Sequence, residues 1–422
     1  MYKAKLPPNI RPQDGSRLAT GTFYICDECG AAHQSAEPER CHVCRASMGG
    51  IHPIRNVLRI DNVETLPAER ITANDEDRQR QGFDIQTVFA WPWRDGKLDV
   101  MASVAEDEAG PILSLAYASG AAISRLNKGL RRRKDKSIFG FAIDPTTGRW
   151  TGSKEEGDDD EPDRPARQRV VPIVQDNKNA LLLQLPGPAL SETAMATLQH
   201  ALTRGLEVVF QLEEGEILTE PVPARDRRRG ILFFEATEGG AGVLGRLTND
   251  PPALSQVARA ALELMHYDNV DAAMAEAAAD ALTEAPDARC VAGCYRCLLS
   301  YYNQPDHELI NRIDGEVKTI LLRLARGRVA AAIPQSETTQ NGDWHAALAR
   351  WGLPAPDGTP LTVEGTNLPL AWRTRLAAAA IGPVDDQARK AAEALGFAVA
   401  ILPEAPGDAP PPQLVDLLGQ SA

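Results

Sequence analysis

Two compact groups of cysteines constrain the fold of this chain most strongly. The first group follows C-x2-C-x11-C-x2-C and consists of Cys26, Cys29, Cys41 and Cys44; the second follows C-x3-C-x2-C and consists of Cys290, Cys294 and Cys297. All seven cysteines of the 422 residues lie in these groups. Gaps of this length let thiolates on one tight turn face a single tetrahedral Zn²⁺. Disulfides are typical of small secreted chains, and we recognise no secretory segment, so the pattern predicts two zinc ions per chain.

The second group lacks one of the four donors that a tetrahedral site needs. Asp306, His266 and His307 are the candidates. His307 is the nearest on the downstream side, giving C-x3-C-x2-C-x9-H, and an imidazole completes a Cys3His site well. We therefore predict His307 as the fourth ligand.

Strands and helices alternate in the sequence, which predicts a mixed, multidomain α/β protein. We expect strands near residues 54–60, 85–89, 170–174, 180–185 and 231–234, with a turn at Asp176-Asn177. Helices are expected at 74–81, at 118–130, after Ser191 and at 385–395, the last followed by a strand at 397–402. The expected domains are an irregular lead-in (1–20), a zinc ribbon (21–48), a β-rich domain (51–150), an acidic linker (151–168), a zinc-binding α/β domain (169–327) and a C-terminal α/β segment (346–422).

The charge of the chain is unevenly distributed. The net charge of −13 argues against attraction of nucleic acid to the whole surface, but two short runs are strongly basic. Such a run is either a solvated face or a DNA-binding stripe. The candidate DNA contacts are Arg125, Lys128, Arg131, Arg132, Arg133, Lys134, Arg227, Arg228 and Arg229. Because no apolar run approaches the roughly 20 residues of a membrane span, we expect no membrane partner and a cytoplasmic protein.

A glycine-rich turn follows the strand expected at 231–234. Gly239, Gly240 and Gly242 precede a helix, so their backbone N–H groups could hold a phosphate, or the glycines could simply permit a tight turn. The sequence contains no G-x-x-x-x-G-K-[ST], G-x-S-x-G or H-E-x-x-H motif. We therefore predict no catalytic residue.

The stretches EATEGGAGV (235–243) and CVAGCYRCLLSYYNQ (290–304) resemble the MrfA-type zinc-binding domain. That domain lies at the C-terminus of many bacterial superfamily 2 helicases and in helicase partner proteins of phage-defence systems. The resemblance implies C-x3-C-x2-C-x5-C, with four cysteines on zinc. The fourth family position falls on Asn303 here, which makes His307 the expected replacement.

The ribbon and the stretch ERITANDEDRQRQGF (69–83) resemble the region that the defence proteins carry between motor and zinc domain. The helicase motor itself is absent from this sequence. The chain resembles the partner subunit of the DISARM system or the C-terminal arm of a Druantia-like helicase. The resemblance implies a non-catalytic, zinc-containing, DNA-binding subunit of a superfamily 2 helicase in antiviral defence. Two alternatives are a nuclease formed by the C-terminal segment and a scaffold that binds only proteins; Ala377–Ile381, the expected catalytic strand, lacks the acidic and lysine residues of such a nuclease.

Overall fold

The chain forms two compact units in a computed structural model, Met1–Ala332 and Ile333–Ala422. The structure describes residues 2–12, 17–34, 38–67, 82–94, 97–150, 167–187, 189–237, 239–286, 288–331, 344, 347–357, 361–363, 366–382, 384, 386–403, 406–407 and 409–419. The helix expected at 74–81 and nearly all of the acidic linker lie outside these residues. Among the described residues, no helix has the length and apolar character needed to cross a membrane.

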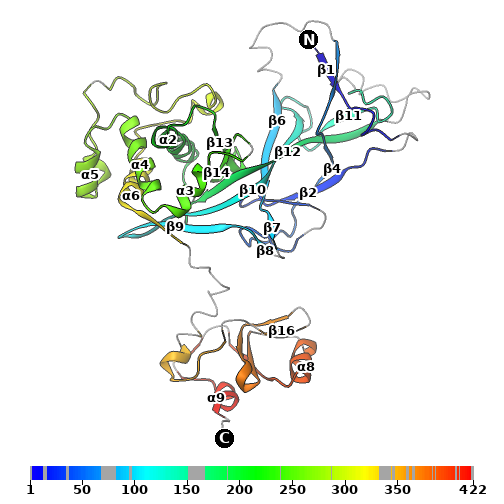
Figure 1. Ribbon diagram of the computed structural model, residues 1–422, viewed down its shortest axis with the longest axis vertical. Coiled ribbons are helices and arrows are strands. Elements are labelled where there is room, and N and C mark those ends of the chain that lie inside the picture. The colour runs from blue at the N-terminus through cyan, green and yellow to red at the C-terminus, as the bar shows by residue number, and fades with distance from the viewer. Residues whose placement is uncertain are drawn as a thin grey trace. The chain divides into compact units, whose positions relative to one another are not determined.

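An eleven-stranded sheet forms the framework of the first unit (Figure 1). Its strands are β2 (Gly21–Ile25), β3 (Ala32–Gln34), β4 (Ile54–Arg59), β6 (Phe83–Ala90), β9 (Met101–Asp107), β10 (Gly110–Leu130), β11 (Phe141–Ile143), β12 (Gln168–Gln184), β13 (Ile217–Ala224), β14 (Arg227–Glu235) and β15 (Arg328–Ala331). Two small ribbons accompany it: β1 (Tyr2–Lys5) with β5 (Glu64–Pro67), and β7 (Trp93–Arg94) with β8 (Lys97–Leu98). The mixed α/β class is therefore confirmed, with strands more abundant than the sequence suggests.

The long strands β10 and β12 correct two expectations. Residues 118–130 are the second half of β10 rather than a helix, and β12 runs through Asp176-Asn177 without a turn. The two strands pair antiparallel from Ser114↔Gln184 to Leu126↔Ile173, and β10 also pairs with β6. Hydrogen bonding to neighbours on both sides stabilises the extended backbone and outweighs the local helical tendency of this segment.

The sheet joins segments that the sequence assigns to three domains. Strands β2 and β3 of the ribbon continue through β4 to β12, which pairs with β14 of the second zinc-binding region. Consecutive residues of β12 point into different cores: Leu181 and Leu183 face the helical side, whereas Leu182 packs with the ribbon cysteines. Residues 21–327 accordingly belong to one compact unit.

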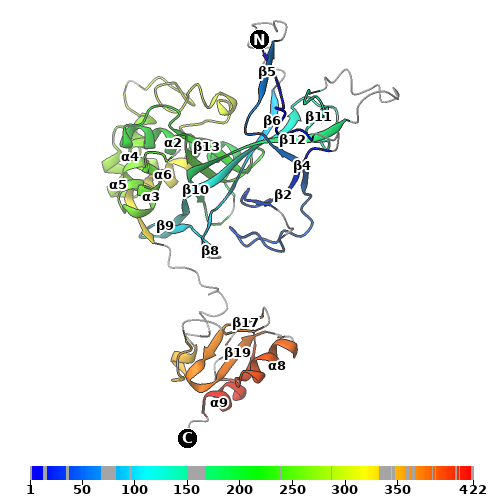
Figure 2. The same ribbon diagram turned by 45° about the vertical axis from the view of Figure 1, so that its right-hand side comes forward.

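Helices cover one face of the sheet beside β13 and β14 (Figures 1 and 2). They are α2 (Glu192–Phe210), α3 (Val243–Asn249), α4 (Ala253–Leu264), α5 (Val270–Glu276) and α6 (Gly315–Arg326), with 3-10 turns η1 (Ala279–Ala281) and η2 (Gln304–Asp306). As expected, α2 begins after Ser191, whose Oγ accepts a hydrogen bond from the backbone N–H of Ala194. The apolar stripes of α2, α4 and α6 share one core.

The second unit is a small α/β fold. Its elements are β16 (Leu361–Val363), β17 (Thr366–Leu368), β18 (Leu370–Trp372), η3 (Arg373–Arg375), β19 (Ala377–Ile381), α8 (Asp386–Ala394), β20 (Ala398–Leu402) and α9 (Pro412–Gly419). The expected helix and following strand are confirmed as α8 and β20, and β20 lies parallel to β19.

Candidate zinc centres

The four cysteines of the ribbon converge on one point. The Sγ atoms of Cys26 and Cys44 are 3.5 Å apart, and those of Cys29 and Cys41 are 3.6 Å apart. Sulfur atoms of a disulfide would be about 2.0 Å apart, whereas Zn–S bonds of about 2.3 Å give tetrahedral edges of about 3.8 Å. The spacing therefore fits a zinc ion and excludes disulfides among these cysteines.

Two tight turns place these sulfur atoms. In the first turn the Gly30 N–H donates to the Cys26 carbonyl, and in the second the Arg45 N–H donates to the Cys41 carbonyl. Gly30 and Arg45 both adopt a left-handed backbone, with φ of 77° and 62°. At Gly30 a Cβ would lie 3.1 Å from the Cα of Pro223, so glycine also allows the turn to approach strand β13 closely.

The thiols of this cluster cannot ionise independently. Hydrogen bonds from the other three cysteines lower the pKa of Cys26, whereas the neighbouring thiols and burial raise the pKa of Cys29 and Cys41. Several adjacent thiolates in a buried site repel one another. A bound dication removes this penalty, which is a second reason that the cluster fits zinc.

His266 completes the second cluster. The donor atoms of His266, Cys290, Cys294 and Cys297 all lie within 4.8 Å of one another. The Sγ atoms of Cys290 and Cys297 are 3.7 Å apart, and Nε2 of His266 is 3.4 Å from Sγ of Cys294. These separations match the edges of a tetrahedral Cys3His site. The two clusters thus fit two zinc ions per chain, as predicted.

The choice of His307 as a ligand is corrected by this geometry. Nε2 of His307 lies 3.0 Å from the carbonyl oxygen of Ser300 and 2.9 Å from Oδ1 of Asn303, so His307 braces the loop instead. His266 immediately follows the C-cap of α4 with a left-handed φ of 69°, which turns it toward the cysteine loop. Sequence spacing favoured the downstream histidine because it could not show that α4 ends beside this loop.

Arg312 holds the two halves of the second cluster together, and no motif in the sequence pointed to this residue. Its guanidinium donates to the carbonyls of Cys290 (2.8 Å from Nε) and Met265 (3.2 Å from Nη1), and it pairs with Glu284 at 2.9 Å. Its side chain is only 2% exposed. One buried cation thus fixes the backbone of one ligand and the residue preceding another, His266.

The carboxylate of Glu235 accepts hydrogen bonds from the glycine-rich turn and the helix that follows it. Oε2 of Glu235 accepts from the Gly242 N–H at 3.2 Å and from Asn179 at 2.9 Å, and its Oε1 accepts from the Leu244 N–H. A Cβ on Gly240 would collide with this carboxylate, so the glycine is required for packing. The N–H groups expected to hold a phosphate at Gly239, Gly240 and Gly242 are thus occupied in part by Glu235, which favours the tight-turn interpretation.

The second basic run makes internal ion pairs. Arg228 is 6% exposed, and its Nη2 donates to Asp306 at 2.6 Å. On the other side of β14, Arg227 pairs with Asp27 at 3.0 Å and Arg229 pairs with Glu28, both in the first zinc turn. Arg228 is therefore a buried structural residue rather than a DNA contact, whereas Arg227 and Arg229 remain about half exposed.

Asp306 receives several donors besides Arg228. Nε2 of His200 lies 3.0 Å away and Nη1 of Arg225 lies 3.2 Å away. Burial alone would raise the pKa of Asp306, but these hydrogen bonds and positive charges hold it well below its usual range. Burial lowers the pKa of His200, although its hydrogen bond to Asp306 acts in the opposite direction.

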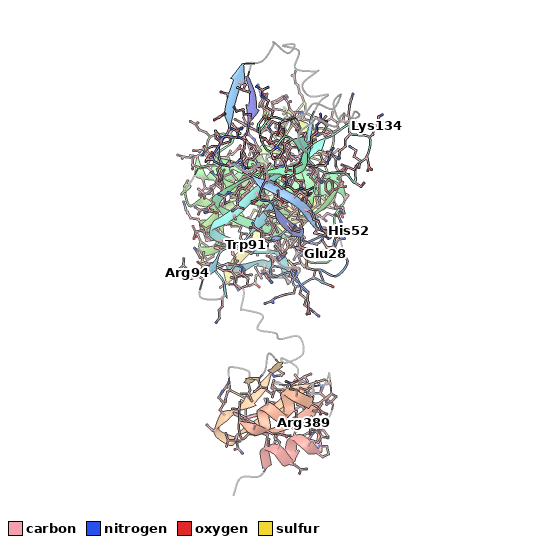
Figure 3. All side chains as sticks on the ribbon, turned by 90° about the vertical axis from the view of Figure 1, so that its right-hand side faces the viewer. Glu28, His52, Trp91, Arg94, Lys134 and Arg389 are labelled. Atoms are coloured by element: carbon pink, nitrogen blue, oxygen red, sulfur yellow. The ribbon has the colours of Figure 1, made fainter. Side chains whose placement is uncertain are left out.

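The first basic run lies along β10 and the turn after it. Arg133 pairs with Asp84 at 2.9 Å, Lys128 lies 3.8 Å from the same carboxylate, and Arg131 donates to the carbonyl of Phe83. Arg132 and Lys134 are exposed, and within the described part of the chain neither makes an ion pair. Arg125 lies on the sheet, 5.9 Å from the ring of Phe234. Lys134 extends from the periphery of the first unit (Figure 3).

Comparison with known proteins gives one family match, and it covers the second cluster. Residues 198–298 match the model of the MrfA Zn-binding domain. Among solved structures, a crystal structure of the DUF1998 helicase MrfA bound to DNA is 13% identical; the match covers 57% of this chain and 26% of that chain, with a TM-score of 0.28. This chain therefore spans about a quarter of that helicase. No curated protein matches the chain significantly. The matched residues include all four donors of the second cluster, His266, Cys290, Cys294 and Cys297, so the segment that is similar to the MrfA Zn-binding domain also has a donor set that fits zinc.

Proposed function

We propose that this chain is a non-catalytic, DNA-binding accessory subunit of a superfamily 2 helicase and acts in defence against phage, in a system of the DISARM or Druantia type. The observation that carries the proposal is the MrfA Zn-binding domain at residues 198–298 with its complete set of zinc donors. In the helicases that the sequence resembles, such a domain accompanies a motor. This sequence contains no phosphate-binding motor motif, so the partner supplies ATP hydrolysis.

An exposed apolar strip on the sheet is the proposed contact with the motor. Phe83 and Ile85 on β6 are 48% and 53% exposed, and Val174 on β12 is 52% exposed. The register places Ile85 opposite Asn127 and Val174 opposite Arg125, so the strip follows one face of β10. Grouped apolar side chains in water favour association with another protein surface.

The turn after β10 is the proposed DNA contact. On this turn Arg132 and Lys134 are exposed, and within the described part of the chain their side chains make neither an ion pair nor a hydrogen bond. Phosphate contacts by such side chains release counterions and make DNA binding depend on salt. Arg131 lies beside them, but its Nε is hydrogen-bonded to the backbone.

Co-expression with a motor-bearing helicase encoded beside this gene tests the partner. A stable complex on gel filtration is expected, and the chain alone should neither hydrolyse ATP nor cleave DNA with Mg²⁺. For DNA binding, Arg132→Ala/Lys134→Ala should lower the salt slope by about 1.4–1.8, at 0.7–0.9 per lost phosphate contact. Arg389→Ala/Lys390→Ala on α8 removes the same charge and should leave the slope unchanged. Absence of a helicase complex, or ATPase activity in this chain, would contradict the proposal.

A further inference from the structure

The loop of the second zinc cluster exposes three tyrosine rings. Tyr295, Tyr301 and Tyr302 are 64%, 75% and 63% exposed, and Tyr301 contacts Tyr302 edge-to-face at 5.8 Å. By contrast, Tyr267, which packs behind the same cluster, is 4% exposed. The zinc site fixes the loop, so the exposed rings are held on a rigid support. Grouped exposed aromatic rings are typical of binding surfaces.

Tyr302 lies beside a cavity of about 360 Å³. The cavity is bounded by α2, by β13 with the segment before it, and by the zinc loop, which contribute Thr203, Thr219 and Asn303 among others. The ring of Tyr302 packs against Gly215, where a Cβ would lie 3.1 Å from its Cζ. The hydroxyl end of the ring therefore rests on backbone, and the ring is 63% exposed at the cavity.

The lining of this cavity is polar but nearly neutral. Its buried or half-buried carboxylates are paired with arginines: Glu207 with Arg204, Glu220 with Arg225, and Asp306 with Arg228. Among the described residues, Arg125 and Glu214 line the cavity without an ion pair. Paired charges with hydroxyl and amide groups suit an uncharged polar ring better than a phosphate. A nucleobase is such a ring, and the volume lies in the range of small-ligand pockets.

The loop that carries the tyrosines also carries exposed cations. Arg289 and Arg296 are exposed on the zinc loop and make no ion pair within the described part of the chain. Arg125 adds a third cation at the cavity. Proteins that hold single strands combine this chemistry, with aromatic rings for the bases and cations for the backbone.

We propose that the exposed tyrosines and the cavity beside Tyr302 form a base-stacking site for single-stranded DNA. One base stacks on the exposed ring of Tyr302 with its edge toward the cavity, and the neighbouring base contacts Tyr301. The site rests on the proposed DNA-binding function and adds a strand preference to it. Duplex DNA keeps its bases paired and stacked, so it cannot use this site.

Anisotropy of a labelled oligothymidine and of a matched duplex, with the zinc-loaded full chain, tests this site. Tyr302→Ala should weaken single-strand binding by about 5- to 150-fold. It should leave duplex binding within about twofold, because the duplex contacts of the basic turn are untouched. Tyr302→Phe keeps the ring and should bind like the wild type. Val291→Ala changes another exposed apolar side chain of the loop and is the matched control.

Two zinc ions per chain and an unchanged thermal midpoint establish that each variant is folded. Equal single-strand affinity of Tyr302→Ala and wild type would overturn the site while leaving the accessory function standing. Loss of helicase capture by Tyr302→Ala, with DNA binding intact, would identify the patch as a protein contact and also overturn it. If the wild-type chain bound no DNA of either kind, the DNA-binding part of the proposed function would fail as well.

Discussion

Replacement of Arg312 by methionine should release the second zinc ion selectively. Methionine has a comparable length but cannot donate hydrogen bonds, so the carbonyls of Met265 and Cys290 lose the buried guanidinium. Each buried carbonyl left without a partner costs about 1–3 kcal/mol, which gives about 2–6 kcal/mol for the two. The ion pair with Glu284 adds little, because that carboxylate is half exposed.

This loss is a large fraction of the 5–15 kcal/mol that usually stabilises a folded domain. It is also localised, because Met265 precedes the ligand His266 and Cys290 is itself a ligand. Loss of a group that orients metal ligands typically lowers metal affinity about 10- to 100-fold. Arg312→Met should therefore lose one zinc ion early when challenged with a chromogenic chelator, and keep the ribbon zinc.

Arg323→Met is the matched control for this experiment. Arg323 lies on α6 and makes two hydrogen bonds to Asp107, at 2.9 and 2.7 Å, away from both clusters. Its loss should lower the urea midpoint without changing zinc release. If Arg312→Met released zinc at the wild-type rate, or no faster than Arg323→Met, Arg312 would not hold the metal site together.

Three further predictions follow from the buried polar groups. His266→Gln should leave about one zinc ion per chain by metal analysis, whereas His307→Gln should retain two; the reverse result would restore His307 as the ligand. Because burial lowers the pKa of His200, the unfolded state binds more protons below about pH 6.5, so stability should fall there by up to about 1.4 kcal/mol per pH unit. Urea unfolding at several pH values should show a smaller slope for His200→Gln, and an unchanged slope would refute the assignment. Asp306→Asn should lower the free energy of unfolding in urea by about 3–5 kcal/mol, because it leaves the buried Arg228 without its ion pair. Asp27→Asn breaks an exposed pair and should lower it by less than about 1 kcal/mol. Equal losses for the two variants would contradict this reasoning.

Features set by short stretches of sequence could be predicted well. The cysteine spacing gave seven of the eight zinc donors because a thiolate pair on one turn is a local property. The Ser191 cap and the helix–strand pair α8–β20 are likewise determined by neighbouring residues. The family resemblance drawn from residues 235–304 agrees with the match at 198–298.

Features set by long-range packing could not be predicted. His266 became a ligand because α4 ends beside a loop that follows much later in the chain. Residues 118–130 became a strand because β6 and β12 pair with both of its edges. A local sequence pattern shows neither which strand will pair with a segment nor where a helix end will lie in space. For this reason the sequence favoured a helix at 118–130 and His307 as the fourth ligand.

The hairpin of β13 and β14 shows why a basic run can mislead. Successive side chains of a strand point to opposite faces, so Arg227 and Arg229 reach the first zinc turn while Arg228 reaches Asp306 on the loop after the second cluster. In the sequence these three arginines resemble a nucleic-acid-binding stripe. In the folded protein they are divided between the first zinc turn and Asp306. The same alternation links both zinc modules to one strand. Within the part of the chain that the structure describes, Arg132 and Lys134 on the turn after β10 and Arg289 and Arg296 on the zinc loop are exposed and make no ion pair, which is why the proposed DNA contacts are placed there.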